Sequence, residues 1–431
     1  MVTKTDQLRA LSASTLSFTV CFAVWTIFSI IGVSIKEELG LNSTQFATLA
    51  ATPVLTGALS RIFLGIWTDQ YGGRRIFTLV MLFAATATFA IRFGSTYTHY
   101  IIAALGIGLA GGSFAVGVAY VSKWYEKEKQ GTALGIFGMG NVGAAITNFG
   151  APLLLLAVGG VWQNVATIYA IVLAATAILF FIFTKEDPVT LKRRQEGKAP
   201  PSVFEQLKPL KDLRVWRFSL YYFFVFGAFV SLAIWLPQYY KNVYGLSLAV
   251  AGSLAFWYSM PGSVFRALGG YLSDKFGARA VMYWTFIGSL ICLFFLAYPA
   301  TDYTVYGVNG PMSFHFEVGL KFFLVLTIAL GFFMSLGKAA VYKHIPFYYP
   351  DQVGAVGGMV GLVGGLGGFC LPILYGYLND KTGIWTSCFM ALFILVAIAL
   401  TWMHFTIRRL DRQRHPKLLE ETDLPEMVQN S

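Results

Sequence analysis

The chain has 431 residues, of which 56% are hydrophobic and only 12% are charged. Apolar stretches of about twenty residues recur along almost its whole length, which excludes a soluble globular domain and indicates a protein dissolved in lipid. The formal net charge of +11 is spread over short loops, so it favours a topology signal over nucleic-acid binding.

The apolar stretches are continuous and do not alternate with polar residues, which predicts membrane-spanning helices and excludes a β-barrel. We therefore expect an all-α polytopic membrane protein with twelve transmembrane helices, six on each side of a polar linker. The first six are expected at about 13–35, 44–68, 76–94, 98–122, 131–155 and 162–184. The last six are expected at about 216–240, 248–272, 280–299, 318–342, 354–378 and 383–407.

The polar linker divides the chain into four parts. We expect an N-terminal six-helix half at 1–184, a cytoplasmic linker at 185–215, a C-terminal six-helix half at 216–407 and a cytoplasmic tail at 408–431. The linker, the tail and alternate short loops hold most of the basic residues. By the positive-inside rule, both termini of this multi-pass chain are then cytoplasmic, in the cell (inner) membrane.

An internal repeat supports the two related halves. The segment RIFLGIWTDQYGGRR from Arg61 matches RALGGYLSDKFGARA from Arg266 at a constant offset of 205 residues. In a second match, Gly131, Gly135 and Gly138 correspond to Gly354, Gly358 and Gly361. Two matches in the same order predict an internally duplicated transporter with two pseudo-symmetric halves.

Three cations lie well inside predicted spans, whereas all 21 acidic residues fall in loops, helix ends or tails. Arg61 and Arg266 are too deep to reach the interface easily, and a central arginine costs about 2.5–3.5 kcal/mol even on the lenient insertion scale. An anionic substrate held between the halves is the simplest compensation. The alternative is that both arginines bond backbone carbonyls or line a water-filled cavity.

Arginine rather than lysine at both positions implies a planar or oxygen-rich anion such as nitrate, nitrite, formate or another carboxylate. The third cation, Lys338, is the best candidate for proton coupling because a buried ammonium without a partner readily sheds its proton. The alternative is a lysine that snorkels or bonds to backbone oxygens.

Two further groups of residues suit a transporter of a small ion. Glycine-rich helices five and eleven allow close helix approach, and Asn141 in the first of them offers an amide to the substrate. At the cytoplasmic helix ends, the repeated Asp-x-x-Gly-x-Arg spacing predicts ion pairs that close an inner gate, although positive-inside loops alone would need no such role. These gating residues are Asp69, Arg74, Asp274 and Arg279.

The motif GIWTDQYGGRR resembles the signature of the major facilitator superfamily. ALGIFGMGNVGAAITNFGAP and GGMVGLVGGLGGFCLP resemble the paired nitrate signatures of its nitrate/nitrite porter (NarK-type) family. This resemblance implies the major facilitator fold and a nitrate clamped between Arg61 and Arg266. It further implies a set of supporting residues. Asn141 and Tyr222 act as added donors, Phe114 and Phe226 sandwich the anion, and the backbones near Gly138 and Gly364 slide past it.

The stretch GKAAVYKHIPFYYPDQVGAVGG resembles the proton-coupled symporter branch of that family. We therefore expect a secondary active transporter that takes up nitrate, and alternatively nitrite, together with protons, and that works as a monomer in the bilayer. The alternatives are a nitrate/nitrite exchanger, an organic anion exchanger of the formate or oxalate type, and a membrane nitrate sensor. An enzyme, a cofactor and a metal site are not expected, because no catalytic or metal-ligand constellation is found in the spans.

Overall fold

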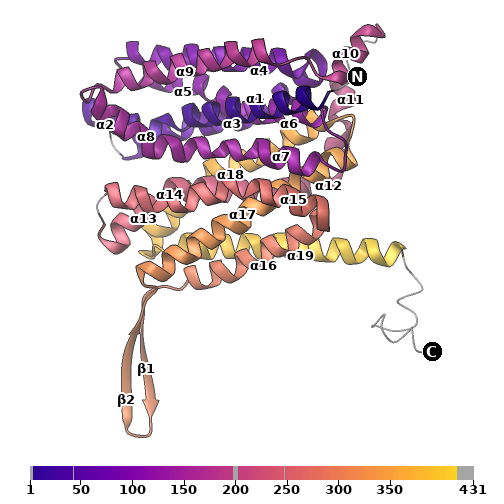
Figure 1. Ribbon diagram of the computed structural model, residues 1–431. Helices are drawn as coiled ribbons and strands as arrows, with labels where there is room; N and C mark the ends of the chain where they lie inside the picture. The colour runs from indigo at the N-terminus through magenta and orange to yellow at the C-terminus, as the bar shows by residue number, and fades with distance from the viewer. Residues whose placement is uncertain (1–2, 42, 198–201, 247, 415–431) are drawn as a thin grey trace, which may run out of the picture.

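The computed structural model describes residues 3–41, 43–197, 202–246 and 248–414, so parts of the expected linker (198–201) and tail (415–431) lie outside the described residues. Two groups of helices lie side by side with their axes in one common direction, the N-terminal half in indigo to magenta and the C-terminal half in pink to yellow (Figure 1). Both ends of the described chain lie at one end of this bundle, the termini-bearing end. A β-hairpin lies at the other, the hairpin end.

The N-terminal half forms the six predicted spans, several of them divided by short turns. Its elements are α1 (Lys4–Trp25), η1 (Ile27–Ser29), α2 (Ile31–Leu39), α3 (Ser43–Tyr71), α4 (Gly73–Ala90), η2 (Ile91–Phe93), α5 (Tyr97–Ile107), α6 (Leu109–Ser122), α7 (Gln130–Gly138), η3 (Met139–Val142), α8 (Gly143–Ala157) and α9 (Trp162–Phe183). The linker holds α10 (Pro188–Gln195), α11 (Val203–Leu207) and η4 (Lys208–Lys211).

The C-terminal half repeats this order of helices and adds the hairpin. Its elements are α12 (Leu213–Tyr222), the π-helical turn η5 (Phe223–Ala228), α13 (Phe229–Tyr244), α14 (Leu248–Val264), α15 (Arg266–Phe276), α16 (Ala278–Leu296), β1 (Thr301–Gly307), β2 (Gly310–Phe316), α17 (Leu320–Tyr348), α18 (Val353–Thr382) and α19 (Ser387–Arg414). Among the described residues, eleven helical stretches are long and apolar enough to cross a membrane. The pair α14 and α15 takes the place of the eighth predicted span.

The eighth span is interrupted at one residue, whereas the sequence predicts one continuous helix at 248–272. Pro261 lies inside α14 and has no N–H to donate to the turn before it, and the N–H of Phe265 still donates to the carbonyl of Pro261 at 3.0 Å. The helix ends at Val264, and a new helix begins at Arg266 after Phe265. This break puts Arg266 in the first turn of α15.

The hairpin is the second departure from an all-helical chain, since the sequence predicts only a loop after the ninth span. Strands β1 and β2 pair in an antiparallel register from Thr301 and Phe316 to Gly307 and Gly310. Gly310 adopts a φ of 108° that follows the Val308–Asn309 turn, a backbone conformation that favours glycine.

The two halves touch through glycines at two symmetry-related crossings. In one, α3 of the first half packs on α18 of the second, and a Cβ on Gly65 would overlap the carbonyl of Gly354. In the other, α15 packs on α7, and a Cβ on Gly270 would overlap the carbonyl of Gly131. Backbone contact at both crossings draws the centres of the halves together and positions the buried arginines.

Candidate anion-binding site

Arg61 lies in the middle of α3 and is fully buried. Its Nε donates to the carbonyl of Gly111 on α6 at 3.3 Å, and its Nη1 donates to the carbonyl of Gly361 on α18 at 2.6 Å. Its Nη2 is buried and has no hydrogen-bond partner. The guanidinium is therefore held between the two halves with one of its three nitrogens left without a partner.

Arg266 is the counterpart of Arg61 in the second half and is 1% exposed. Its Nη2 donates to the hydroxyl of Tyr222 at 3.4 Å, while its Nε and Nη1 have no partner. It packs against the backbone of Gly138, where a Cβ would overlap the guanidinium. Each arginine thus reaches a glycine of the opposite half, and Gly138 and Gly361 are matched glycines of the sequence repeat.

Aromatic rings cover the two guanidinium groups. The ring of Phe114 has the Cζ atoms of Arg61 and Arg266 at 5.6 and 4.8 Å from its centre, so both arginines flank one ring. Phe226 lies parallel to Phe114, with ring centres 6.5 Å apart and planes 11° apart, and its centre is 4.9 Å from Cζ of Arg61. Tyr222 is parallel to both rings. These three rings and the two arginines define the aromatic slot.

Asn141 and Gly364 lie around the same region of the bundle. Asn141 is buried in the 3₁₀ turn η3, and neither its amide nitrogen nor its amide oxygen has a partner. Gly364 on α18 lets the ring of Tyr222 approach, since a Cβ there would overlap that ring. Departures from regular α-helix at η3 and at η5, which carries Phe226, accompany the site residues, as is common at functional sites.

The chemistry of the aromatic slot is that of an anion receptor. Leaving a buried charged donor unsatisfied is costly, yet three arginine nitrogens, which carry five N–H groups, have no hydrogen-bond partner. Neither arginine forms an ion pair with a carboxylate in the described parts of the chain. The geometry therefore suits a small, flat, oxygen-rich anion that accepts several charge-assisted hydrogen bonds at once.

Lys338 lies in α17 and is fully buried, but outside the aromatic slot. Its Nζ donates to the carbonyl of Gly262 at 2.7 Å and lies 3.2 Å from the ring centre of Phe229. This contact with a backbone oxygen is the structural alternative that the sequence leaves open. One carbonyl satisfies one of the three N–H groups of an ammonium.

The two repeated aspartates join the halves at the termini-bearing end. Asp69 accepts from the backbone N–H of Gly354 at 3.0 Å, in the first turn of α18. Asp274 accepts from the backbone N–H groups of Gly131 at 3.2 Å and Thr132 at 2.7 Å, in the first turn of α7. A carboxylate at a helix N-terminus is favoured by the unpaired N–H groups and the helix dipole. We call this symmetric pair of contacts the aspartate latch.

The ion pairs of the latch differ from those expected. Asp69 pairs with Lys123 at 3.1 Å, and Asp274 pairs with Lys343 at 2.6 Å. The spacing along the sequence predicts ion pairs with Arg74 and Arg279 instead. Lys343 also donates to the carbonyl of Lys127 in the first half. The lysines reach the aspartates because Lys123 follows the last residue of α6, which packs beside α3, and Lys343 lies near the end of α17, which packs beside α15.

Arg74 and Arg279 have other partners. The guanidinium of Arg74 donates to the carbonyl of Phe181 and lies 4.0 Å from its ring centre. The backbone N–H of Arg74 donates to Glu186, and burial together with the charge of Asp187 raises the pKa of that Glu186 carboxyl. Arg279 donates to the hydroxyl of Tyr348 at 3.3 Å. These arginines fasten helix ends within their own halves.

Three residues at the candidate site and the aspartate latch were not predicted from the sequence to have these roles. Tyr342 stands edge-on to Phe114 and Tyr222, with its hydroxyl bonded to the carbonyl of Gly357. Lys123 and Lys343 complete the latch. A repeat could have revealed the lysines, because GVAYVSK from Gly117 and GKAAVYK from Gly337 share glycine, alanine, valine and lysine at the same positions. At the position of Lys338 the first half has Val118, so that lysine breaks the symmetry.

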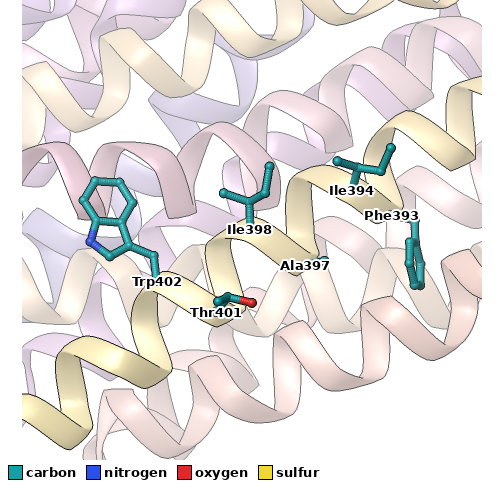
Figure 2. A pocket seen from close by; sticks show the side chains of 6 residues that line it. All are labelled: Phe393, Ile394, Ala397, Ile398, Thr401 and Trp402. Carbon is teal, nitrogen blue, oxygen red and sulfur yellow. The ribbon is translucent and has the colours of Figure 1, made fainter.

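A shallow groove on the described surface does not include either arginine in its lining. Figure 2 shows its lining on one face of α19, where the six side chains are apolar apart from Thr401. Its residues are Phe393, Ile394, Ala397, Ile398, Thr401 and Trp402. A groove of this composition suits lipid and not an anion.

The sequence of the whole chain matches known transporters. The Major Facilitator Superfamily matches residues 13–320 and 307–428. The probable nitrate/nitrite antiporter NarK1 of Thermus thermophilus is 42% identical, over 97% of this chain and 96% of the relative. The nitrite extrusion protein of Bacillus subtilis is 32% identical over 92% and 95%. The probable nitrate transporter NarT of Staphylococcus haemolyticus is 31% identical over 94% and 98%.

A solved structure supports the fold independently. The human organic anion transporter MFSD10 (TETRAN) superposes with a TM-score of 0.71 over 92% of this chain and 99% of that one, at 14% sequence identity. Its identity is too low to carry more than the architecture. With the sequence matches, it confirms the predicted major facilitator fold. The sequence matches themselves show the family: the chain belongs to the NarK-type nitrate/nitrite transporters of the major facilitator superfamily.

Proposed function

We propose that the chain carries nitrate across the membrane by alternating access, with the anion clamped between Arg61 and Arg266. The observation that supports this most directly is the set of unpaired donors, Arg61 Nη2 and Arg266 Nε and Nη1, buried beside one phenylalanine ring. Asn141 and the free hydroxyl proton of Tyr222 add neutral donors. A nitrate ion would restore the hydrogen bonds that burial removes from these groups.

The aromatic rings support a flat substrate. The 6.5 Å between the centres of Phe114 and Phe226 is slightly less than twice the contact distance of about 3.5 Å between stacked carbon atoms. That spacing favours a planar ion of few atoms over a tetrahedral one. Nitrite shares the planarity and the charge, so it is the second substrate. Each half supplies one arginine, which makes one chain sufficient for a complete site.

The buried site fits an occluded step of the transport cycle. Arg61 and Arg266 are closed from solvent, the aspartate latch joins the halves at the termini-bearing end, and the ring of Phe149 contacts that of Phe256 across the halves nearer the hairpin end. In our proposal the termini-bearing end is cytoplasmic and the aspartate latch is its gate. Opening that gate separates Asp69 and Asp274 from the helices of the opposite half.

We further propose that nitrate entry is coupled to protons through Lys338. It is buried with a single carbonyl acceptor, so a charged ammonium there leaves two N–H groups without an acceptor, whereas a neutral amine leaves one and avoids the cost of burying a charge. Loss of its proton would lower the charge of the empty carrier as it returns. The second candidate is nitrate/nitrite exchange, which the name of the Thermus relative favours. In an exchanger, an anion neutralises the arginines in both directions.

The test is uptake of labelled nitrate by proteoliposomes that hold the purified chain. We expect an inward proton gradient to drive nitrate accumulation without internal anion, and a protonophore to abolish it. Uptake that needs internal nitrite and ignores the gradient would instead establish exchange. Failure to transport either anion, with formate or oxalate transported, would overturn the nitrate assignment.

A further inference from the structure

The β1–β2 hairpin has one apolar and one polar face. In the antiparallel register, Tyr303 lies opposite Phe314 and Val305 opposite Met312, so these side chains share one face with Phe316. The other face carries the pairs Asp302–His315 and Thr304–Ser313, with the pair Tyr306–Pro311 next to the turn. Such a division is typical of an element that lies between an apolar and an aqueous medium.

The polar face satisfies its own groups. His315 Nδ1 and a carboxylate oxygen of Asp302 are 2.7 Å apart, and the hydroxyls of Thr304 and Ser313 are 3.2 Å apart. The hydrogen bond to Asp302 raises the pKa of His315, which keeps this face polar. In contrast, the apolar face is bare, with Met312 59% and Phe314 53% exposed. Contact with water is therefore favourable for the polar face and unfavourable for the apolar face.

The position of the hairpin places it at the level where the helices end. It begins five residues after Leu296, the end of α16, and α17 begins at Leu320, four residues after β2 ends. It then runs across the direction of the helices and reaches away from the bundle (Figure 1). Strands of seven residues reach roughly 23 Å, about two helix diameters.

The lipid-facing surface of the bundle continues directly to the base of the hairpin. A groove there is lined by apolar side chains of α16 and α19 and by the residues that lead into β1. Its lining residues are Phe294, Ala297, Tyr298, Pro299, Met390, Phe393 and Ile394. Phe393 and Ile394 also line the α19 groove of Figure 2, so the two grooves are continuous. From Met390 to Trp402 this surface extends roughly 18 Å along the helix, about the thickness of one leaflet.

We propose that the hairpin is an interfacial anchor that lies on the lipid surface at the hairpin end, with its apolar face on the acyl chains and its polar face in water. The aromatic side chains Tyr303, Phe314 and Phe316 then belong to the aromatic belt that membrane proteins place at this depth. The continuous groove below holds acyl chains of the same leaflet. The anchor fixes the loop between α16 and α17 to the membrane.

The test uses neighbouring positions on opposite faces. In full-length protein with its four cysteines replaced by serine, a single cysteine is introduced by V305C or M312C on the apolar face, and by T304C or S313C as matched controls. Each is labelled with the environment-sensitive fluorophore NBD in phosphatidylcholine vesicles. We expect spin-labelled phosphatidylcholine to quench the apolar-face labels at least about threefold more than the controls, and aqueous iodide to show the reverse order.

Two outcomes would overturn the anchor. Equal iodide quenching on both faces would mean that the hairpin stands in water. Protection of the apolar face from iodide without lipid quenching, and dependent on the protein-to-lipid ratio, would mean that a second copy covers it. Neither readout uses transport, so the result is independent of the substrate.

Discussion

At the scale of single residues, the planar guanidinium groups of Arg61 and Arg266 are the main donors of the proposed anion site. A lysine at position 61 or 266 keeps the charge but supplies a point donor, so a bidentate contact with nitrate is lost. We expect R61K or R266K to weaken nitrate binding by about 1.5–3 kcal/mol, roughly tenfold to over a hundredfold, and to abolish uptake. Binding is measured by calorimetry in detergent and uptake in proteoliposomes.

The matched control for these variants is R92K, an exposed arginine of the first half whose Nη1 contacts Thr167. It should transport nitrate as the unchanged protein does. Near-normal uptake by R61K or R266K would contradict the clamp.

Lys338 is a second single residue with a proposed role, in proton coupling and not in anion binding. In K338Q the amide can still donate to the carbonyl of Gly262, whereas it has no proton to exchange. We expect uptake driven by a proton gradient to fall at least about tenfold, with nitrate affinity within roughly threefold of the original, less than 1 kcal/mol. Parallel measurement of uptake between external pH 5.5 and 8 and of equilibrium binding separates the two effects. Proton-driven uptake that survives the substitution would return Lys338 to a packing role.

At the scale of helices, the aspartate latch holds one end of the bundle closed. D69N and D274N each remove a negative charge from a helix N-terminus and an ion pair with lysine, while an amide oxygen can still accept from the backbone. The charge–dipole part alone is about 1 kcal/mol. We expect each variant to shift the population toward the form that is open at the termini-bearing end by roughly fivefold.

Distances between spin labels on the two halves at that end measure this shift. D302N on the exposed hairpin is the control, since it removes an aspartate far from the latch. Unchanged distance distributions in both D69N and D274N would show that glycine packing alone keeps the end closed.

Helices also show what the sequence could reveal. Hydropathy located the spans because each needs about twenty apolar residues, and the repeat located Arg61 and Arg266 on matched helices. The interruption at Phe265 was missed because that residue lies in an apolar run that reads as one helix. Lys123 and Lys343 as partners of the aspartates depend on contacts between helices far apart in the chain, which spacing along one helix does not encode. The hairpin, in contrast, had a local signal in its alternating residues around Asn309–Gly310.

At the scale of the whole molecule, the buried site implies that each end opens in turn. Phe149 on α8 and Phe256 on α14 meet across the halves nearer the hairpin end, with ring centres 6.0 Å apart. In a cysteine-free background, we expect a reducible cross-linker between F149C and F256C to stop uptake, since that end can then no longer open. Reductant should restore it.

The single-cysteine variants are the controls for this experiment and should keep transporting after treatment with the same reagent. Continued uptake by the cross-linked double variant would mean that the pathway does not pass between α8 and α14.

The backbone contacts at Gly65–Gly354 and Gly131–Gly270 affect the equilibrium between the conformations that open to the two sides of the membrane. No room is left for a Cβ at either crossing. A single added methyl group would therefore overlap the opposite half and push the two halves apart. The overlap would raise the free energy only of the conformation in which the termini-bearing end is closed. We therefore expect a single alanine at any of these four glycines to bias which side of the membrane the site faces.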